Sequence, residues 1–436
     1  ALAWKLTQSP RLGRLWVDPA ANAGQRELGT PCPESFDPQK RFFLKRWCER
    51  ESIGLVVIGP DNRLAEGMAD DLADPPRRLV FGPTRAAARI EWDKAWAKQI
   101  MRRAAVPTAE GRTFEHVDAA LAYVRSRGEP VVVKASGLCL GKGVTVCDTR
   151  DDAEQAVHRF MVDRIHGDAG ATIVVEERLE GPELSVLALV DGRTVWLLEP
   201  ARDHKRVGEG DTGPNTGGMG AFSPVPEATP ELLSKVARDI MLPTIDAMRL
   251  EGIEYRGVLY AGLMLTPAGP KVLEFNARFG DPETQVILPR LRGDLVRILW
   301  STAAGSLEEE QCSIDPRCAC CVVVCSGGYP GEIRKGLPIH HLPESTLAAE
   351  MERPQSEAVL CFQAGTGRDE QGRLVTAGGR VVGVTVLADT AERARTLATE
   401  AASSVRFDGA FHRRDIGAAA VSPDARRKSS TLRATT

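Results

Sequence analysis

The sequence predicts a protein of several domains that combines α/β and α+β architecture. Its 436 residues are enough for roughly two to four domains with cores of their own. Near the beginning, strand-like residues 15–17 and 55–58 flank a helical stretch over residues 39–50. This strand–helix–strand order is typical of a parallel sheet. We therefore expect an α/β domain with a parallel sheet in the first part of the chain.

The last part of the chain has a different character. A polar stretch over residues 301–317 predicts a domain boundary. Beyond it, strand-like residues 320–325 and 381–387 and a helical pattern over 391–403 indicate a small α+β domain. Residues 423–436 are basic and rich in Ser and Thr, with almost no apolar side chains, so we expect them to be disordered.

Composition and charge argue against two classes of partner. The formal net charge is −3, from 56 basic and 59 acidic residues, which gives no overall attraction to nucleic acid or to a membrane surface. No apolar run is long enough to span a bilayer. Five of the ten cysteines lie within residues 312–325, where the apolar composition favours a buried strand over a zinc site. Reduced thiols of this kind are typical of a cytoplasmic protein.

A strand that ends in polar residues is the first candidate for a functional site. Residues 272–275 are apolar and strand-like, and alternation would place Leu273 and Phe275 on one face. Glu274, Asn276 and Arg278 would then share the other face. Two oxygen side chains about 7 Å apart along a strand can bind one hard cation, and a guanidinium beyond them can bind a phosphate. The alternative is a strand end whose polar groups only face water.

A glycine-rich loop between two strands is the second candidate. Residues 137–143 connect strand-like residues 131–134 and 144–147, and Lys134 and Lys142 bracket the glycines. The spacing is not that of a P-loop, and a strand rather than a helix follows. Backbone amides of such a loop can cover phosphates, although a plain mobile hairpin is the alternative. Lys94, near the beginning of a helix expected over residues 85–104, is either a further phosphate ligand or a solvated surface lysine.

Two further segments have the composition of binding segments. The strand over residues 173–179 ends in acidic residues, where its backbone N–H and C=O groups can form hydrogen bonds with the edge of a purine. Glu183 can accept a hydrogen bond from a ribose hydroxyl. Residues 207–223 form a long polar, glycine-rich loop inside a domain, which indicates binding rather than linkage.

These motifs together resemble the phosphoribosylamine–glycine ligase family of the ATP-grasp superfamily. The resemblance runs from Ala1 to about Ile416. The runs that carry it are Asp203–Arg206, Asp211–Gly220 and Glu274–Glu283, with Gly327–Pro330, Ala364–Thr366 and Gly378–Val381 towards the end. It implies an ATP-grasp core, an N-terminal Rossmann-like domain and a small C-terminal α+β domain.

The resemblance also implies an activity. ATP, glycine and 5-phosphoribosylamine would give glycinamide ribonucleotide, ADP and phosphate through a glycyl phosphate, a step of purine synthesis. The cofactors would be ATP and Mg²⁺ (or Mn²⁺), and we expect a cytoplasmic monomer that binds these small molecules but neither nucleic acid nor membrane.

The residue roles implied by the family fall into four groups. The catalytic group is Asp203, Lys205, Arg278 and Asp281. The ATP-binding group is Lys94, Lys134, Gly141, Lys142, Gly143, Glu176, Glu177, Leu179 and Glu183. The metal ligands are Glu274 and Asn276. The substrate-binding group is Asp211, Asn215, Thr216, Gly217, Gly218 and Glu283.

The predicted boundaries follow the same resemblance. They are 1–83 for the Rossmann-like domain, 84–104 for a connecting helix, 105–178 for the lid subdomain with the glycine-rich loop, 179–312 for the catalytic subdomain, 313–418 for the C-terminal domain and 419–436 for the tail.

The sequence departs from the family pattern at several positions. Ser136 stands where Asp is usual, Trp92–Asp93 replaces a Gly–Ser pair and Gln363 replaces His. Cys139–Leu140 replaces small residues, and Asp61–Arg63 replaces Glu-Ala-Pro. The family's opening strand and glycine-rich turn, which help to bind the ribosylamine phosphate, do not precede Ala1.

Two alternatives to an active ligase of this family therefore stand. One is another ATP-grasp carboxylate–amine ligase or a biotin-dependent carboxylase, against which the Asp211–Gly220 loop argues. The other is a nucleotide-binding chain with little turnover, because the opening phosphate-binding turn is missing.

Overall fold

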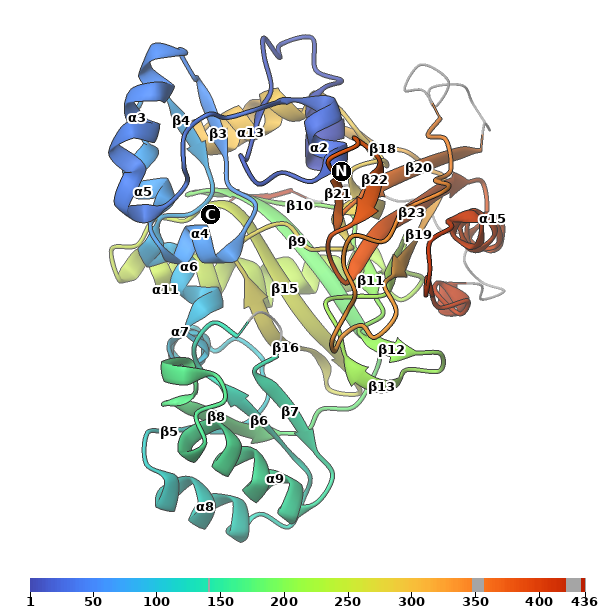
Figure 1. The fold of residues 1–436 in the computed structure, drawn as a ribbon. Coiled ribbons are helices and arrows are strands. Elements are labelled where there is room, and N and C mark those ends of the chain that lie inside the picture. The colour runs from blue at the N-terminus through green and yellow to red at the C-terminus, as the bar shows by residue number, and fades with distance from the viewer. Residues whose placement is uncertain (140–141, 347–356, 421–432, 436) are drawn as a thin grey trace. The chain divides into compact units, whose positions relative to one another are not determined.

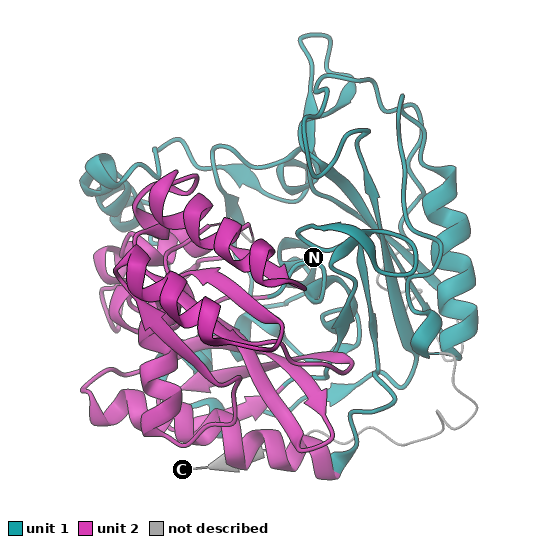
Figure 2. Cartoon of the chain, turned by 90° about the horizontal axis from the view of Figure 1, so that it is seen from below, with its two compact units in different colours: residues 1–54, 198–230, 280–432 teal, residues 55–197, 231–279, 433–436 magenta. Residues whose placement is uncertain are grey.

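The computed structural model describes residues 1–139, 142–346, 357–420 and 433–435. The chain divides into two compact units (Figure 2). Unit 1 contains Ala1–Gly54, Leu198–Pro230 and Gly280–Leu432, and unit 2 contains Leu55–Leu197, Glu231–Phe279 and Arg433–Thr436. Residues 140–141, 347–356, 421–432 and 436, which include the predicted site residue Gly141 and most of the predicted tail, lie outside the described residues.

Unit 2 contains a four-stranded antiparallel sheet with the order β5-β8-β6-β7. Its strands are β5 (Gly111–Phe114), β8 (Ile173–Glu177), β6 (Val131–Ala135) and β7 (Val144–Cys147). Helices α8 (Val117–Ser126) and α9 (Arg150–Val157) share a buried core with this sheet (Figure 1). Thr149 begins α9 with a capping box, in which its side chain and that of Asp152 each accept from the other's backbone N–H.

A second antiparallel sheet of unit 2 has the order β16-β15-β9-β10-β24. Its members are β16 (Gly269–Asn276), β15 (Arg256–Thr266), β9 (Glu183–Asp191), β10 (Thr194–Leu197) and β24 (Arg433–Thr435). The sequence did not predict β24, which pairs with β10. Residues 230–250 form α10 (Pro230–Val236), a π-helical turn (Ala237–Met241) and α11 (Leu242–Leu250).

The parallel pairing predicted for the N-terminal residues is present but divided. Strand β1 (Trp16–Val17) pairs with β2 (Thr30–Pro31) in unit 1, and β3 (Leu55–Val57) pairs with β4 (Leu79–Phe81) in unit 2. We had expected residues 15–17 and 55–58 to belong to one parallel sheet. The structure instead places them in two separate sheets. The short strands β2 and β4 carried too few residues to show a pattern of their own.

The helices of the first hundred residues are shorter than the sequence predicted. Residues 61–72 form two short helices, α4 (Asp61–Ala65) and α5 (Met68–Leu72), because Gly67 between them adopts a φ of +80°. The predicted helix over 85–104 is two helices, α6 (Arg85–Trp92) and α7 (Lys94–Arg103). Asp93 separates them with extended φ and ψ angles and caps α7 through its side chain.

Unit 1 is built on the antiparallel sheet β11-β14-β19-β23-β20. Its strands are β11 (Arg202–Asp203), β14 (Gly220–Ser223), β19 (Cys318–Cys325), β23 (Arg380–Ala388) and β20 (Ala358–Gln363), and α15 (Ala391–Ser404) packs on β19 and β23 (Figure 1). Among the described residues of unit 1, the other α-helices are α1 (Leu2–Leu6), α2 (Ala23–Leu28), α3 (Arg41–Arg50), α12 (Thr284–Ile287) and α13 (Leu295–Ala304).

Strand β19 uses its cysteines as small apolar residues. Cys320, Cys321 and Cys325 are at most 2% exposed, and all ten cysteines are free thiols. Burial raises the pKa of Cys321 and of Cys325 to about 12 each, so these thiols stay protonated and unreactive at neutral pH.

Candidate active site

A β-bulge shapes the strand that carries the predicted metal ligands. In the β15–β16 pair, Glu274 lies opposite Gly262 while Val272 lies opposite Leu263, which leaves Leu273 without a partner. The buried face of β16 therefore contains Val272 and Phe275, at 0% and 3% exposure, and not Leu273 as the simple alternation predicted. The bulge turns the carbonyl of Leu273 towards Lys134, whose Nζ donates to it at 2.9 Å.

Glu274 and Asn276 fit the ligand set of a hard cation. Both are half-buried near the end of β16, and the Asn276 Oδ1 accepts a hydrogen bond from Arg278 at 3.3 Å. The described residues contain no group of three or more His, Cys, Asp or Glu side chains that could hold a metal. A carboxylate and an amide alone suit Mg²⁺, which keeps several water ligands and is completed by substrate phosphates.

Glu91 holds Arg278, and sequence reasoning missed it. This residue of α6 is 9% exposed, lies 3.2 Å from the Arg278 guanidinium and accepts from the backbone N–H of Ala277 at 2.7 Å. Burial raises the pKa of Glu91 to about 7, against the opposing effect of Arg278. The only sequence signal was a charged residue among the apolar positions of an amphipathic helix.

Lys134 belongs to a buried cluster of two lysines and one carboxylate. Glu176, which is 2% exposed, forms ion pairs with Lys134 and, at 2.7 Å, with Lys98. Lys98 Nζ also donates to Thr108 Oγ1 and to the Ala109 carbonyl, at 2.9 and 2.8 Å. The side chain of Glu176 therefore contacts lysines inside the unit, and β8 lies between β5 and β6 at this residue. Lys98 was not singled out from the sequence, because its partner lies far along the chain.

Lys94 is a half-buried residue rather than a solvated surface lysine. It is the first residue of α7, and its Nζ donates to the Gly137 carbonyl at 3.3 Å. Burial lowers the pKa of Lys94 and the charge of Lys134 lowers it further, against the opposing effect of Glu274. Lys134 donates to the carbonyl of Leu273, the residue before Glu274, and Lys94 donates to the carbonyl of Gly137, just beyond the end of the strand that carries Lys134. Lys94, Lys134 and Glu274 therefore form one charged neighbourhood in unit 2.

The glycine-rich loop is the connection of the β6–β7 hairpin, as predicted. The Ala135 N–H donates to the Gly143 carbonyl at 2.8 Å, and the Lys142 N–H donates to the Cys139 carbonyl at 3.0 Å. Lys142 is exposed and Gly143 is buried. A Cβ at Gly137 would lie 2.6 Å from the Cα of Ala169, so a larger residue would displace the beginning of the loop.

The predicted purine-binding residues lie in and after β8. Glu177 accepts from Lys271 at 2.8 Å and from the Glu110 N–H at 3.0 Å. Burial raises the pKa of Glu177, but these two hydrogen bonds outweigh it and hold the pKa below its usual value. Leu179 is half-buried in the segment between β8 and β9, which connects the two antiparallel sheets of unit 2, and Glu183 begins β9.

Unit 1 contains the predicted substrate-binding loop. Strands β12 (Arg206–Gly208) and β13 (Thr212–Asn215) form a hairpin in which Asn215 lies opposite Arg206. The Thr216 N–H and hydroxyl both donate to the Lys205 carbonyl, at 2.7 and 2.8 Å, and Asp203 lies in β11 opposite Ala221. Asn215 and Gly217 are exposed, and Gly218 is buried.

Two arginines that the sequence did not single out hold this part of unit 1. Arg413, at 1% exposure, donates to Asp211 at 2.8 Å and to Asp415 at 2.6 Å. Arg380 donates to the Gly217 carbonyl at 2.6 Å and to the Asp281 carboxylate at 2.8 Å, and so connects the loop to residue 281.

Glu283 is 2% exposed and packs closely on Gly280. A Cβ at Gly280 would lie 2.6 Å from the Oε2 of Glu283, so a larger residue at this position would displace the Glu283 carboxylate.

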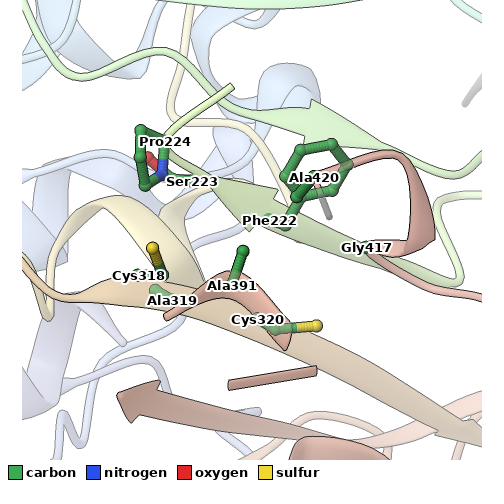
Figure 3. A pocket seen from close by; sticks show the side chains of 9 residues that line it. All are labelled: Phe222, Ser223, Pro224, Cys318, Ala319, Cys320, Ala391, Gly417 and Ala420. Carbon is green, nitrogen blue, oxygen red and sulfur yellow. The ribbon is translucent and has the colours of Figure 1, made fainter. Parts of the chain in front are cut away.

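A small apolar pocket elsewhere in unit 1 contains none of the predicted site residues (Figure 3). It is lined by Phe222, Ser223, Pro224, Cys318, Ala319, Cys320, Ala391, Gly417 and Ala420. The Ser223 hydroxyl is already bound to the Pro200 carbonyl at 2.8 Å, and burial raises the pKa of both cysteines, so the pocket offers little chemistry.

Comparison with known proteins first defines the class of protein to which this chain belongs. Residues 92–284 match the family domain described as phosphoribosylglycinamide synthetase, ATP-grasp (A) domain, and residues 1–91 and 319–419 match its N and C domains. A biotin carboxylase domain from Hydrogenobacter thermophilus, crystallised with MgADP and bicarbonate, has a TM-score of 0.64 at 16% identity over 89% of this chain and 83% of that one. The fold is an ATP-grasp fold with an N-terminal and a C-terminal domain.

The family follows from closer relatives. The phosphoribosylamine–glycine ligase of Rhodopirellula baltica is 45% identical over 95% of this chain and 94% of its own length. The crystal structure of the phosphoribosylamine–glycine ligase of Thermotoga maritima has a TM-score of 0.79 at 32% identity, over 95% of this chain and 96% of that one. The chain belongs to the phosphoribosylamine–glycine ligase family, as the sequence motifs indicated. None of its described helices is long and apolar enough to cross a membrane.

Proposed function

We propose that this enzyme uses ATP to join glycine to 5-phosphoribosylamine, which yields glycinamide ribonucleotide, ADP and phosphate. The γ-phosphate is first transferred to the glycine carboxylate, because a free carboxylate is a poor electrophile. The amine of the ribosylamine then attacks the carbonyl carbon of the glycyl phosphate, and phosphate leaves. Membership of the family supports this reaction.

The single observation that carries the mechanism is the charged neighbourhood around Glu274. Glu274 and Asn276 would hold Mg²⁺, or Mn²⁺ in its place, and the metal would neutralise charge on the ATP phosphates. Lys94, Lys134 and Arg278 bind and orient the same phosphates, and Glu91 keeps the Arg278 guanidinium in place. The protein thus supplies positioning and positive charge, which is what phosphoryl transfer requires.

The remaining roles are proposed by unit. In unit 2, the β6–β7 loop with Gly141, Lys142 and Gly143 covers the phosphates. The β8–β9 segment with Glu177, Leu179 and Glu183 binds the nucleoside, and Glu176 orients Lys134. In unit 1, Asp203, Lys205 and Asp281 act on glycine and the ribosylamine. The substrate-binding residues there are Asp211, Asn215, Thr216, Gly217, Gly218 and Glu283. We also propose a cytoplasmic monomer, in keeping with ten free thiols.

Replacement of one metal ligand tests the mechanism. Glu274→Gln keeps the shape of the side chain and removes its charge. We expect turnover to fall by about a hundredfold or more, and part of the loss to be recovered at high Mg²⁺. Thermal unfolding should change little, because Glu274 is not part of the apolar core. Wild-type turnover of Glu274→Gln at ordinary Mg²⁺ would disprove the metal role.

A carboxylase of the biotin-dependent type is the second candidate, because such proteins share the fold. ADP release measured with glycine plus phosphoribosylamine, and separately with bicarbonate plus biotin, separates the two. We expect ADP release only with the first pair.

A further inference from the structure

Asp93 and Ser136 form a hydrogen-bonded pair between α7 and the end of β6. The Ser136 hydroxyl donates to the Asp93 Oδ1 at 2.9 Å. Ser136 is 5% exposed, and Asp93 is half-buried and also accepts from Arg89 at 2.8 Å. Both residues belong to unit 2.

The pair accounts for most of the beginning of α7. The first four N–H groups of an α-helix, counted from the N-cap residue, have no partner within the helix. Here the Lys94 N–H donates to the Ser136 carbonyl at 3.0 Å and the Ala95 N–H donates to the Ser136 hydroxyl at 2.9 Å. The Trp96 N–H donates to the Asp93 carboxylate at 3.1 Å, and the Asp93 N–H donates to the Arg89 carbonyl at 3.0 Å. Asp93 and Ser136 therefore satisfy three of the four groups.

This arrangement fixes Lys94 from two directions. Lys94 follows Asp93 directly, so the cap sets the direction in which its side chain leaves the helix. Its Nζ donates to the carbonyl of Gly137, which follows Ser136 directly. The same pair therefore determines both the origin of the Lys94 side chain and the position of the loop residue that the ammonium group contacts.

We propose that Asp93 and Ser136 are positioning residues for Lys94, and that a carboxylate and a hydroxyl are interchangeable between the two positions. The proposal rests on the proposed role of Lys94 in binding the phosphates of ATP. It agrees with the sequence, since Asp93 and Ser136 are two of the departures from the family pattern. Each carries the residue type that is usual at the other position.

Exchanging the side chains at positions 93 and 136 would keep most of the hydrogen bonds of the pair. With serine at 93 and aspartate at 136, the serine hydroxyl accepts from the Trp96 N–H and donates to the new carboxylate. That carboxylate also accepts from the Ala95 N–H, so only the two hydrogen bonds from Arg89 are lost. Ser136→Asp alone instead places two carboxylates in contact, and Asp93→Ser alone removes the charge that Arg89 and the helix N-terminus bind.

The test measures the KM for ATP, the KM for glycine, kcat and the thermal midpoint in the full chain. The variants are Asp93→Ser, Ser136→Asp, the double exchange, Lys94→Met alone, and Lys94→Met combined with each of the two single changes. We expect the KM for ATP to rise about tenfold or more in Ser136→Asp, about threefold in Asp93→Ser, and to return to within about twofold in the double exchange. The KM for glycine should stay near the wild-type value throughout.

Asp294→Ser is the matched control. Asp294 also caps a ten-residue helix, α13, with a side chain that is 19% exposed, against 20% for Asp93, and it also pairs with an arginine. We expect it to lower the thermal midpoint by as much as Asp93→Ser does, without a change in the KM for ATP. Binding of a non-hydrolysable ATP analogue with Mg²⁺ gives a readout that does not need turnover.

The outcomes separate the inference from the proposed function. If the effects act through Lys94, Asp93→Ser should add little to Lys94→Met. Full additivity, an unchanged KM for ATP in both single variants, or a double exchange no better than Ser136→Asp would each overturn the inference. An unchanged KM for ATP in Lys94→Met would overturn it together with the role of Lys94. Product formation by the wild-type chain would still support the ligase function.

Discussion

Burial raises the pKa of Glu91 to about 7, although Arg278 and the Ala277 N–H oppose the rise. A carboxyl group whose pKa is higher in the folded state than in the unfolded chain stabilises the fold when protonated. The contribution is fully present below the unfolded value of 4.5 and is lost as the pH rises through about 7. Without metal and nucleotide, the free energy of unfolding should therefore fall over this range.

Glu91→Gln isolates this contribution. The amide resembles the protonated acid, so the variant should show a flatter profile between pH 4.5 and 7 than the wild type. The two profiles should diverge by about 3 kcal/mol, given about 1.4 kcal/mol for each unit of pKa. Urea unfolding at several pH values measures this. Parallel profiles would show that Glu91 has an ordinary pKa.

At the level of elements, the β6–β7 loop carries the contact with the ATP phosphates that we propose. Backbone amides that cover phosphates exchange with solvent until the ligand binds. We expect hydrogen exchange at residues 137–139 and 142–143 to slow when a non-hydrolysable ATP analogue and Mg²⁺ bind. Exchange in α15, in unit 1, serves as the reference. Equal exchange in the loop with and without saturating analogue would contradict the role of the loop.

Arg380, the first residue of β23, ties two segments that we propose to bind substrate to the sheet of unit 1. It holds both the Gly217 carbonyl and the Asp281 carboxylate. Arg380→Gln should raise the KM for glycine or for the ribosylamine by about tenfold, because it frees both segments. The affinity for the ATP analogue should not change. Arg373→Gln, which removes an exposed arginine paired with Asp369, is the control. A wild-type KM for both substrates would argue against this function of Arg380.

For the whole molecule, the sequence predicted those elements whose patterns are local. The strands around Val131, Cys320 and Val381 carry apolar runs, and the binding loops carry glycines and charges at short range. These features appear as β6, β19, β23 and the loops that follow or precede them. The family and its fold could be predicted because several such motifs occur in the right order.

Features that depend on distant contacts could not be predicted from local patterns. The bulge at Leu273 depends on the pairing with β15. Glu91 meets the Ala277 N–H across 186 positions of the sequence, and Lys98 and Glu176 become partners only when α7 and β8 pack. The break at Asp93 had a local signal, because Asp is a common N-cap residue, but the single helix predicted over residues 85–104 ran through this position.

The fate of the glycine oxygens tests the central claim, which is that the carboxylate is activated by phosphorylation before the amine attacks. The measurement uses glycine labelled with ¹⁸O in its carboxylate, together with ATP, Mg²⁺ and phosphoribosylamine, and determines the mass of the phosphate released. Formation of glycyl phosphate transfers one carboxylate oxygen to the phosphate. We predict one ¹⁸O in each phosphate and one in each glycinamide ribonucleotide. Unlabelled phosphate, or ADP release that does not depend on glycine, would contradict the account.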